Sequence, residues 1–500
     1  MNDYEQLIEM MFTDGTLDES VRQEIEGMYD LQKRLHIVKI LDKGLGLFTK
    51  IEGIMNLGKM DYIKEVIKLL KDYVLIADVK QKEAGEVMTP LWFVKEMLSV
   101  LPEDVWSNPK LKWLDPANGT GPYPILVIYK LMVGLKDWEP DDEKRYKHII
   151  ENMIYVSELQ PKNMFLYMNA IDPINEYNLN IYTGSFLERE FDSYMKSVWC
   201  INKVDITIGN PPYQDELVAK KGSAKPLYNI FTEKSISVSN LVSFVTPSRW
   251  FAGGKGLDKF REMMTKSKKI KHITHFDDAT KVFGKSVDIT GGVSYFLIDN
   301  NYQDKCLFDE VFVDLSKYDI IVNPKYYSII DKVSLFDGLE KICKGQSYSG
   351  ITTNDSRLSS TRLNDNQIKC YVSKVNGYEK WVDINQVRES IDLSKWKVIT
   401  AESNGSYPKF GNKFIGRPNE ICNQSYIVFE VNNENEGESL LSYINTKTAN
   451  FLLSIRKISQ HIKPDTCKWI PLIPLDREWS DDSLSIFLNL TEDEKNIIGF

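Results

Sequence analysis

The residues with the clearest chemical potential are the four from Asn210 to Tyr213, Asn-Pro-Pro-Tyr. They follow an apolar run at 204–208, which is typical of a buried strand. The Asn210 amide and the Pro211 carbonyl can accept the two hydrogens of a planar amine such as that of adenine. This favours the pyramidal nitrogen that attack on a methyl group requires, and the prolines fix φ and hold the carbonyl in place. Tyr213 can stack on the ring, but the same four residues also suit an ordinary turn at a strand end.

A second motif, Asp115 to Gly121 (Asp-Pro-Ala-Asn-Gly-Thr-Gly), leads into an apolar stretch at 125–131. Its small residues allow the backbone to approach a ligand closely. It has neither the lysine of a phosphate loop nor the glycine spacing of a dinucleotide site. An acidic residue ahead of the loop suits a cationic ligand that carries an amino group and a sulfonium. Glu158 ends the next predicted strand, where a carboxylate can bind both hydroxyls of a ribose.

Short strands predicted between residues 85 and 300 must position these groups. Apolar runs predict strands at 113–114, 153–156, 179–182, 204–208 and 241–245. Ligands of open α/β sheets bind outside the carboxyl ends of the strands. We therefore expect Asp115, Glu158 and Asn210 at one edge of one sheet.

The two ends of the chain show other patterns. Residues 1–80 carry apolar side chains at helical spacing and are expected to cap the sheet domain. The region 336–500 is mixed, with strands predicted at 397–400 and 425–431 and a long helix at 438–458. A chain of 500 residues is too long for one compact core.

The composition is that of a globular protein, with 42% hydrophobic residues, 27% charged residues and a net charge of −9. This charge excludes a generally basic nucleic-acid coat protein but allows a local basic face, such as the lysine-rich segment Lys255 to Lys271 or simply a solvated helix surface. The six cysteines form no C-x-x-C pair, so no metal is expected. With no apolar run of membrane length, we expect a cytoplasmic location and no membrane partner.

In their order along the chain, the motifs resemble the N6-adenine DNA methyltransferases of restriction–modification type, in the gamma-class order with the recognition domain after the catalytic domain. The segments that carry the resemblance lie mainly between residues 85 and 300, with a second group near the carboxyl end. They are 85–90, 115–121, Glu158, 184–187, 210–213, 225–231, 245–251, 282–284 with 291–293, and then 459–461, 469–471 and 479–482.

The resemblance implies an α/β fold: a Rossmann-like class I methyltransferase sheet, an amino-terminal helical segment and a carboxyl-terminal mixed α+β DNA-recognition domain. The implied boundaries are 1–80 for the helical segment, 81–335 for an S-adenosylmethionine-dependent methyltransferase domain and 336–500 for target recognition. The implied activity is methyl transfer from S-adenosyl-L-methionine to adenine N6 in duplex DNA by base flipping.

It also implies a role for each motif residue. The catalytic residues would be Asn210, Pro211, Pro212 and Tyr213, with Phe283 and Tyr213 lining the pocket for the flipped base. The cofactor would be bound by Thr89, Pro90, Asp115, Pro116, Ala117, Gly119, Gly121, Glu158, Ser185 and Phe186.

Two residues depart from the family pattern. Asn118 stands where a cysteine is common, and its small polar side chain is compatible with the loop. Ser185 stands where an acidic residue is expected to bind the cofactor adenine, and a serine accepts a hydrogen bond more weakly than a carboxylate. We therefore expect weaker cofactor binding or a substitute group.

The expected partner is double-stranded DNA. The sequence leaves open whether a separate restriction endonuclease exists, what the oligomeric state is and which DNA site is recognised. Alternatives are a methyltransferase of the same fold that acts on RNA or a protein glutamine, N4-cytosine as the target, and an inactive DNA-specificity subunit. The large carboxyl-terminal region favours duplex DNA over a protein substrate.

Overall fold

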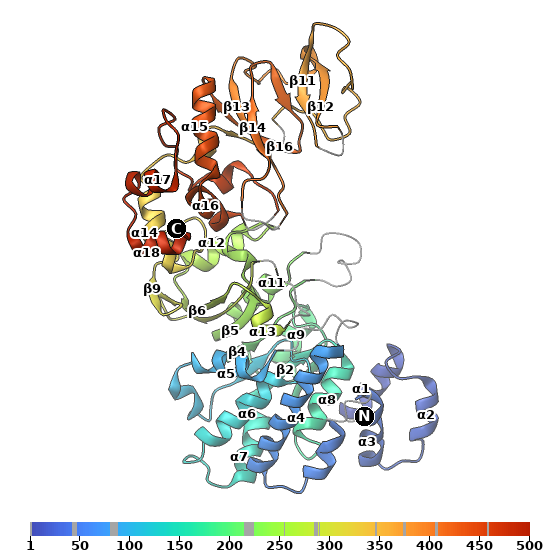
Figure 1. Ribbon diagram of the computed structural model, residues 1–500. Helices are drawn as coiled ribbons and strands as arrows, with labels where there is room; N and C mark the ends of the chain where they lie inside the picture. The colour runs from blue at the N-terminus through green and yellow to red at the C-terminus, as the bar shows by residue number, and fades with distance from the viewer. Residues whose placement is uncertain are drawn as a thin grey trace. The chain divides into compact units, whose positions relative to one another are not determined.

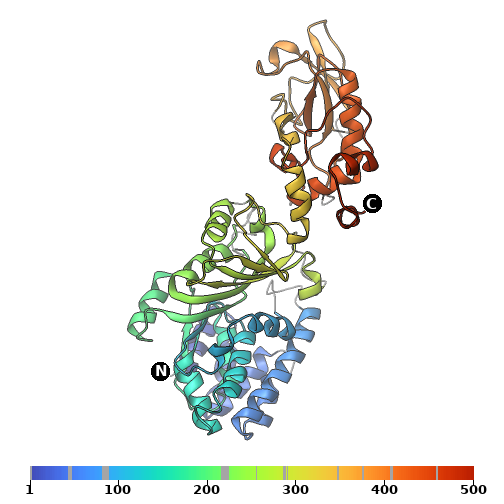
Figure 2. The same cartoon turned by 90° about the vertical axis from the view of Figure 1, so that its left-hand side faces the viewer.

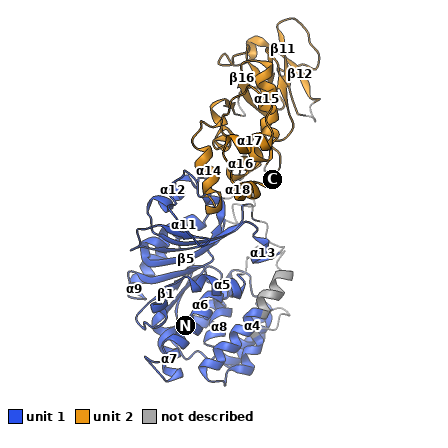
Figure 3. Cartoon of the chain, turned by 60° about the vertical axis from the view of Figure 1, so that its left-hand side comes forward, with its two compact units in different colours: residues 1–321 blue, residues 322–500 orange. Residues whose placement is uncertain are grey.

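The computed structural model describes two compact units, Met1–Ile321 and Val322–Phe500 (Figure 3). The described residues are 3–42, 48–80, 89–214, 225–254, 256–284, 289, 291–345, 348–373, 377–405, 409–457 and 460–500. The division after Ile321 lies upstream of the boundary at 335/336 that the sequence suggests, and the first eighty residues belong to the first unit.

A mixed sheet of nine strands, in the order β3-β2-β1-β4-β5-β7-β6-β8-β9, forms the centre of the first unit. Its strands are β1 (Trp113–Asp115), β2 (Ile154–Glu158), β3 (Asn180–Thr183), β4 (Val204–Gly209), β5 (Ser239–Pro247), β6 (Ile270–Phe276), β7 (Val293–Asp299), β8 (Cys306–Phe308) and β9 (Val311–Val313). Strands β1 to β5 are parallel, and β7 runs antiparallel to β5 and β6. This confirms the predicted Rossmann-like class I methyltransferase sheet.

Helices cover both faces of the sheet, with α4, α6 and α8 on one side and α11 on the other (Figure 1). Figure 2 shows the blue and cyan helices again grouped on one side of the green strands. The helices that follow the amino-terminal segment are α5 (Leu91–Ser99), α6 (Pro122–Gly134), α7 (Asp142–His148), α8 (Pro161–Ile171), α9 (Arg189–Ser197), α11 (Tyr228–Val238), α12 (Asp258–Lys266) and α13 (Thr280–Phe283). Helix α6 is mostly apolar and buries nine of its residues, most of them in the core shared by the helices and the sheet, while Val133 near its end is exposed.

The amino-terminal helices are α1 (Asp3–Thr13), α2 (Glu19–Ile25), α3 (Asp30–Leu41) and α4 (Lys59–Lys80). They share the core of the sheet domain. The buried hydroxyl of Tyr4 donates to the Asp172 carbonyl at 3.0 Å, and that of Tyr62 donates to the Ala170 carbonyl at 2.7 Å. Both acceptors lie at the end of α8, so the predicted helical cap is an integral part of the sheet domain.

The second unit contains two smaller sheets, in the orders β10-β16-β13-β14 and β12-β11-β15. Its strands are β10 (Cys343–Lys344), β11 (Gln367–Tyr371), β12 (Glu379–Asp383), β13 (Trp396–Ala401), β14 (Lys413–Gly416), β15 (Glu420–Cys422) and β16 (Tyr426–Val431), and its helices are α14 (Tyr327–Val333), α15 (Glu434–Asn445), α16 (Lys447–Arg456), α17 (Asp481–Phe487) and α18 (Glu492–Ile498). The mixed α+β prediction and its two strands are therefore confirmed.

The single helix predicted at 438–458 was wrong, because two helices occupy this region. Thr446 has extended backbone angles between α15 and α16, and its hydroxyl accepts a hydrogen bond of 3.1 Å from the Ala449 N–H. A threonine that caps a new helix in this way ends the preceding one.

No helix in the described parts of either unit is long and apolar enough to cross a membrane.

Candidate active site

Three predicted polar residues meet at the carboxyl edge of the sheet. Strand β1 lies between β2 and β4, with Asp115 opposite Val156 on β2 and Leu114 opposite Thr207 on β4. Asp115 and Glu158 are thus the last residues of neighbouring strands, and Asn210 directly follows β4. The topology brings together groups that are 95 positions apart in the sequence, from 115 to 210.

The Asp115–Gly121 loop is closed by hydrogen bonds to the end of β2. The Gly119 N–H donates to Glu158 Oε2 at 2.7 Å, and the Asn118 N–H donates to the Ser157 carbonyl at 3.0 Å. The second carboxylate oxygen of Glu158 accepts from the Gln160 N–H at 2.8 Å. Charge-assisted bonds of this kind are short and strong, so Glu158 fixes the loop conformation.

Two glycines permit close packing around this loop. Gly121 has φ +90°, and a Cβ at this position would overlap the ring of Tyr167 on α8. Gly209, at the end of β4, has φ +153°, and a Cβ there would lie 2.8 Å from Asp115 Oδ1. The backbone of β4 can therefore approach the loop only because no side chain intervenes.

Asp115 is almost fully buried, at 2% exposure. Burial raises the pKa of its carboxyl group to about 8, the nearby charge of Glu158 adds to the rise, and a hydrogen bond of 3.1 Å from the Ala117 N–H opposes it. Its Oδ2 atom is buried and accepts no hydrogen bond within the described residues. A buried acceptor of this kind fits a cationic or hydrogen-bonding ligand.

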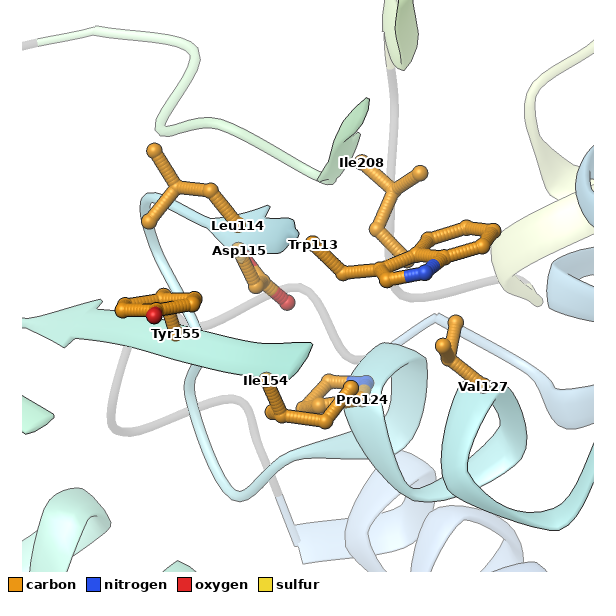
Figure 4. A pocket seen from close by; sticks show the side chains of 8 residues that line it. All are labelled: Trp113, Leu114, Asp115, Pro124, Val127, Ile154, Tyr155 and Ile208. Atoms are coloured by element: carbon orange, nitrogen blue, oxygen red, sulfur yellow. The ribbon is translucent and has the colours of Figure 1, made fainter. Parts of the chain in front are cut away.

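A small hollow lies beneath the loop, between β1, β2, β4 and α6 (Figure 4). Its lining is apolar apart from Asp115 and Tyr155, and it has no room for a water molecule. The residues around it are Trp113, Leu114, Asp115, Pro124, Val127, Ile154, Tyr155 and Ile208. The hollow is a gap in the packing next to Asp115.

Asn210 is held by a residue from a distant part of the chain. Its Nδ2 donates to Thr89 Oγ1 at 3.1 Å, and the hydroxyl of Tyr123 lies 3.4 Å from the same oxygen. Thr89 is 2% exposed, directly before Pro90, the residue that precedes α5. Burial raises the pKa of Tyr213, and the nearby Asn210 side chain opposes part of that rise. The Thr89 hydroxyl therefore fixes the orientation of the Asn210 amide.

Ser185 and Phe186 lie just beyond the end of β3. The Ser185 hydroxyl accepts from the Leu187 N–H at 3.2 Å, so it stabilises its own turn. Phe186 is 1% exposed, and its ring packs against Phe191 and Phe231 at centroid distances of 5.0 and 5.4 Å. In this structure Phe186 forms part of the core below the site and presents no open ring face.

Phe283, the predicted stacking partner of a flipped base, lies in the core at the end of α13. It is 4% exposed and packs on Phe93 of α5 at a centroid distance of 6.0 Å. Its ring is thus enclosed by the first unit. The aromatic residue of the Asn210–Tyr213 motif itself is Tyr213, which is half-buried.

Tyr123 and Tyr167 complete the surroundings of the motifs, and the sequence did not reveal them. Tyr167 lies in an apolar helix where spacing alone indicates a core residue, and only its contact with Gly121 distinguishes it. The first four residues of the motif at 85–90, together with Lys255 and Ser459, lie outside the described residues. Within those residues, no group of three or more histidine, cysteine, aspartate or glutamate side chains is arranged to hold a metal ion.

Comparisons with known proteins match this chain to restriction-modification and adenine-specific methylases. Residues 127–283 match the family model "Eco57I restriction-modification methylase". An uncharacterised adenine-specific methylase of Mycoplasma pneumoniae is 28% identical over 317 residues, covering 48% of this chain and 74% of that protein. The family match includes Glu158 and the Asn210–Tyr213 motif, while the Asp115–Gly121 loop precedes it.

Two solved structures are more distant. A modification subunit of a putative type I restriction enzyme from Vibrio vulnificus is 16% identical over 49% of this chain, with a TM-score of 0.36. The DrdV–DNA complex is 12% identical over 81% of this chain, with a TM-score of 0.45. This chain spans about half the length of the first (51%) and 58% of the second.

Proposed function

We propose that this chain, which carries a domain of the Eco57I restriction-modification methylase family, is a site-specific adenine DNA methyltransferase. It transfers a methyl group from S-adenosyl-L-methionine to N6 of an adenine that is flipped out of duplex DNA. The observation that carries the proposal is the position of the Asn210 amide. Thr89 holds it at 3.1 Å, at the same strand edge as the Asp115 loop and Glu158.

The cofactor is bound by the Asp115–Gly121 loop with Glu158, Thr89 and Pro90. The buried Oδ2 of Asp115 and the open space beside Gly119 fit a ligand that approaches the main chain closely. Glu158, the last residue of β2 and hydrogen-bonded to the loop through the Gly119 N–H, is the carboxylate proposed to bind the ribose hydroxyls. When bound, S-adenosylmethionine supplies a methyl group on a positively charged sulfur. Phe186 supports this site from below, and Ser185 contributes its turn.

The acceptor amine is bound by the Asn210 side chain and the Pro211 carbonyl, with Tyr213 against the base. Thr89 fixes the amide, and Pro211 and Pro212 fix the main chain. Both oxygen atoms accept hydrogen bonds from the adenine amine, and this makes the lone pair of the amine nitrogen more available. Catalysis rests on this positioning and hydrogen bonding, without a strong base.

Flipping the base costs a few kcal/mol of stacking and pairing. Contacts with DNA phosphates and base edges offset that cost. The second unit, Val322–Phe500, is the candidate for these contacts, because it is a separate compact unit and the Asn210 motif belongs to the first. Aromatic and basic residues such as Trp396, Lys413 and Arg417 are candidates for the DNA-facing surface.

The test is methyl transfer from labelled S-adenosylmethionine to duplex DNA, RNA and total protein in parallel, followed by nucleoside analysis. We expect label in DNA as N6-methyladenine only. Label in RNA, in protein glutamine or in N4-methylcytosine identifies a different acceptor and contradicts the proposal. DNA binding without any transfer indicates a specificity subunit.

A further inference from the structure

A short turn at the carboxyl end of β5 carries a cation that the function above does not use. Strand β5 pairs with β4, and Gly209 lies opposite Phe244. The next residue, Asn210, is therefore level with Val245, and β5 continues to Pro247 along the same edge. Arg249 follows in the turn Ser248–Phe251. It is thus a neighbour of the Asn210 motif across one strand pairing.

Arg249 has no counter-charge in the described part of the chain. It is half-buried, and its Nε atom is buried with no hydrogen-bond partner. No ion pair or side-chain hydrogen bond of this guanidinium is recorded among the described residues, in contrast to Arg261, which binds Asp258. A partly buried cation without a partner is costly, and binding of an anion would remove the cost.

Other buried polar atoms in the same turn and at the start of α11 lack hydrogen-bond partners within the described residues. The hydroxyls of Tyr228 and Ser248 are buried and have no hydrogen-bond partner within the described residues. Tyr228 is 2% exposed and Ser248 is 4% exposed. Burial raises the pKa of Tyr228, and the positive charge of Arg249 opposes part of that rise. Asn229 Oδ1 is also buried and unsatisfied. One guanidinium and two hydroxyl donors form a set typical of phosphate binding.

The turn is held rigidly. The Ser248 N–H donates to the Gly292 carbonyl at 3.0 Å, and the Arg249 carbonyl accepts from the Gly253 N–H at 3.1 Å. Between these bonds, Trp250 is fully buried, and its Nε1 lies 3.3 Å from Thr246 Oγ1. An anion bound here would meet donors that need little rearrangement.

The position of Tyr228 indicates which anion is bound. The Leu227 N–H donates to the Tyr213 carbonyl at 3.2 Å, so Tyr228 follows a residue that is tied to the acceptor motif. The carboxylate end of the cofactor is expected instead near Thr89, which contacts the motif through Asn210. We propose that Arg249, with the hydroxyls of Tyr228 and Ser248, binds a phosphodiester of the DNA strand that presents the target base. The proposal rests on the function given above.

The experiment measures DNA affinity against salt concentration, with a short duplex that carries the methylated site identified by modification mapping. Variants are Arg249→Gln, Arg249→Lys and Tyr228→Phe, and the matched control is Arg189→Gln, which removes the same charge from an exposed position on α9. Cofactor affinity and the unfolding temperature are measured for each variant.

We expect Arg249→Gln to weaken duplex binding roughly tenfold to a hundredfold. It should also lower the slope of log affinity against log salt by about 0.9, the value for one phosphate contact. Arg249→Lys should keep the slope, and Tyr228→Phe should weaken binding without changing the slope. The Arg189→Gln control should match the wild type.

If the slope of log DNA affinity against log salt is the same in Arg249→Gln and the wild type, the phosphate site is overturned. The proposed methyltransferase function is not affected by this result. If Arg249→Gln binds the cofactor more weakly and keeps the wild-type salt slope of DNA binding, the anion is the cofactor carboxylate. This result also overturns the phosphate site. Absence of DNA methylation by the wild-type chain overturns the proposed function and this site with it.

Discussion

The side-chain Nδ2 of Asn210 donates a hydrogen bond of 3.1 Å to the hydroxyl of Thr89, which lies 121 positions earlier in the chain. The bond joins the residue after β4 to the residue before Pro90 and α5. It links the motif proposed to hold the acceptor amine to the motif proposed to lie near the cofactor carboxylate. Methyl transfer requires the acceptor amine and the cofactor to be aligned with each other. The bond between Asn210 and Thr89 joins the segments proposed to hold these two ligands.

Removing the Thr89 hydroxyl should therefore slow methyl transfer. In Thr89→Val the shape is kept, but Asn210 Nδ2 loses its acceptor. Loss of one such bond costs about 1–3 kcal/mol, so kcat at saturating cofactor should fall roughly tenfold to a hundredfold. Thr89→Ser keeps the hydroxyl and should retain nearly normal kcat. Equal rates in Thr89→Val and the wild type would show that the bond does not position Asn210.

Cofactor binding should depend on pH through Asp115. Its pKa of about 8 means that the carboxyl group is largely protonated at pH 7 in the free protein. A cationic ligand favours the charged form, so binding should release a proton, and affinity should rise between about pH 6 and 8 and then level off. Calorimetry in buffers of different ionisation enthalpy measures the proton. Asp115→Asn should bind more weakly and lose the Asp115 contribution to the pH dependence. If the wild type and Asp115→Asn release the same number of protons on cofactor binding, the proton comes from another group.

The same carboxyl group should affect stability. Its folded pKa of about 8 exceeds the ordinary value of 3.8. Asp115 therefore stabilises the folded state fully below about pH 4, and this contribution is lost as pH rises through about 8. The unfolding temperature of Asp115→Asn minus that of the wild type should be larger at about pH 9 than at about pH 5. A difference that is constant or shrinks as pH rises would contradict the raised pKa.

Two glycines of the loop separate backbone strain from steric overlap. Gly119 has φ +56° and open space around its missing Cβ, whereas Gly121 has φ +90° and faces the Tyr167 ring. Gly119→Ala should cost about 1–2 kcal/mol for the left-handed backbone alone. Gly121→Ala should cost a further ~1–3 kcal/mol for overpacking, with a larger loss of cofactor affinity. Denaturant unfolding compares them, and equal costs would exclude the Tyr167 contact as the cause. In the double variant Gly121→Ala/Tyr167→Ala, only the stability lost through overpacking should be recovered. The cost of the left-handed backbone should remain.

The sequence predicted those parts of the fold that local patterns determine. Apolar runs located β1, β2, β4 and β5, and polar residues at their ends indicated the functional edge because parallel strands end together. The side-chain surroundings were not predictable in this way. The resemblance assigns ligand contacts to Phe186 and Phe283, but whether an aromatic ring faces a ligand or the core depends on tertiary neighbours such as Phe231 and Phe93.

Other features gave no signal in the hydrophobic pattern of the sequence. The bond between Asn210 and Thr89 and the contact of Gly121 with Tyr167 depend on how distant elements pack. The division of the helix predicted at 438–458 depends on a single threonine, Thr446, which helical periodicity does not distinguish from its neighbours. Helix caps are short-range features that a hydrophobic pattern overlooks.

The central claim is that Asn210 holds the adenine amine during methyl transfer. The most direct measurement is long-read modification mapping of DNA from cells that express the wild-type chain or Asn210→Ala, together with cofactor affinity of both purified proteins. We predict N6-methyladenine at one sequence motif in the wild type, its loss in the variant and similar cofactor affinity. Methylation that persists in Asn210→Ala, or DNA without modification in both, would contradict the account.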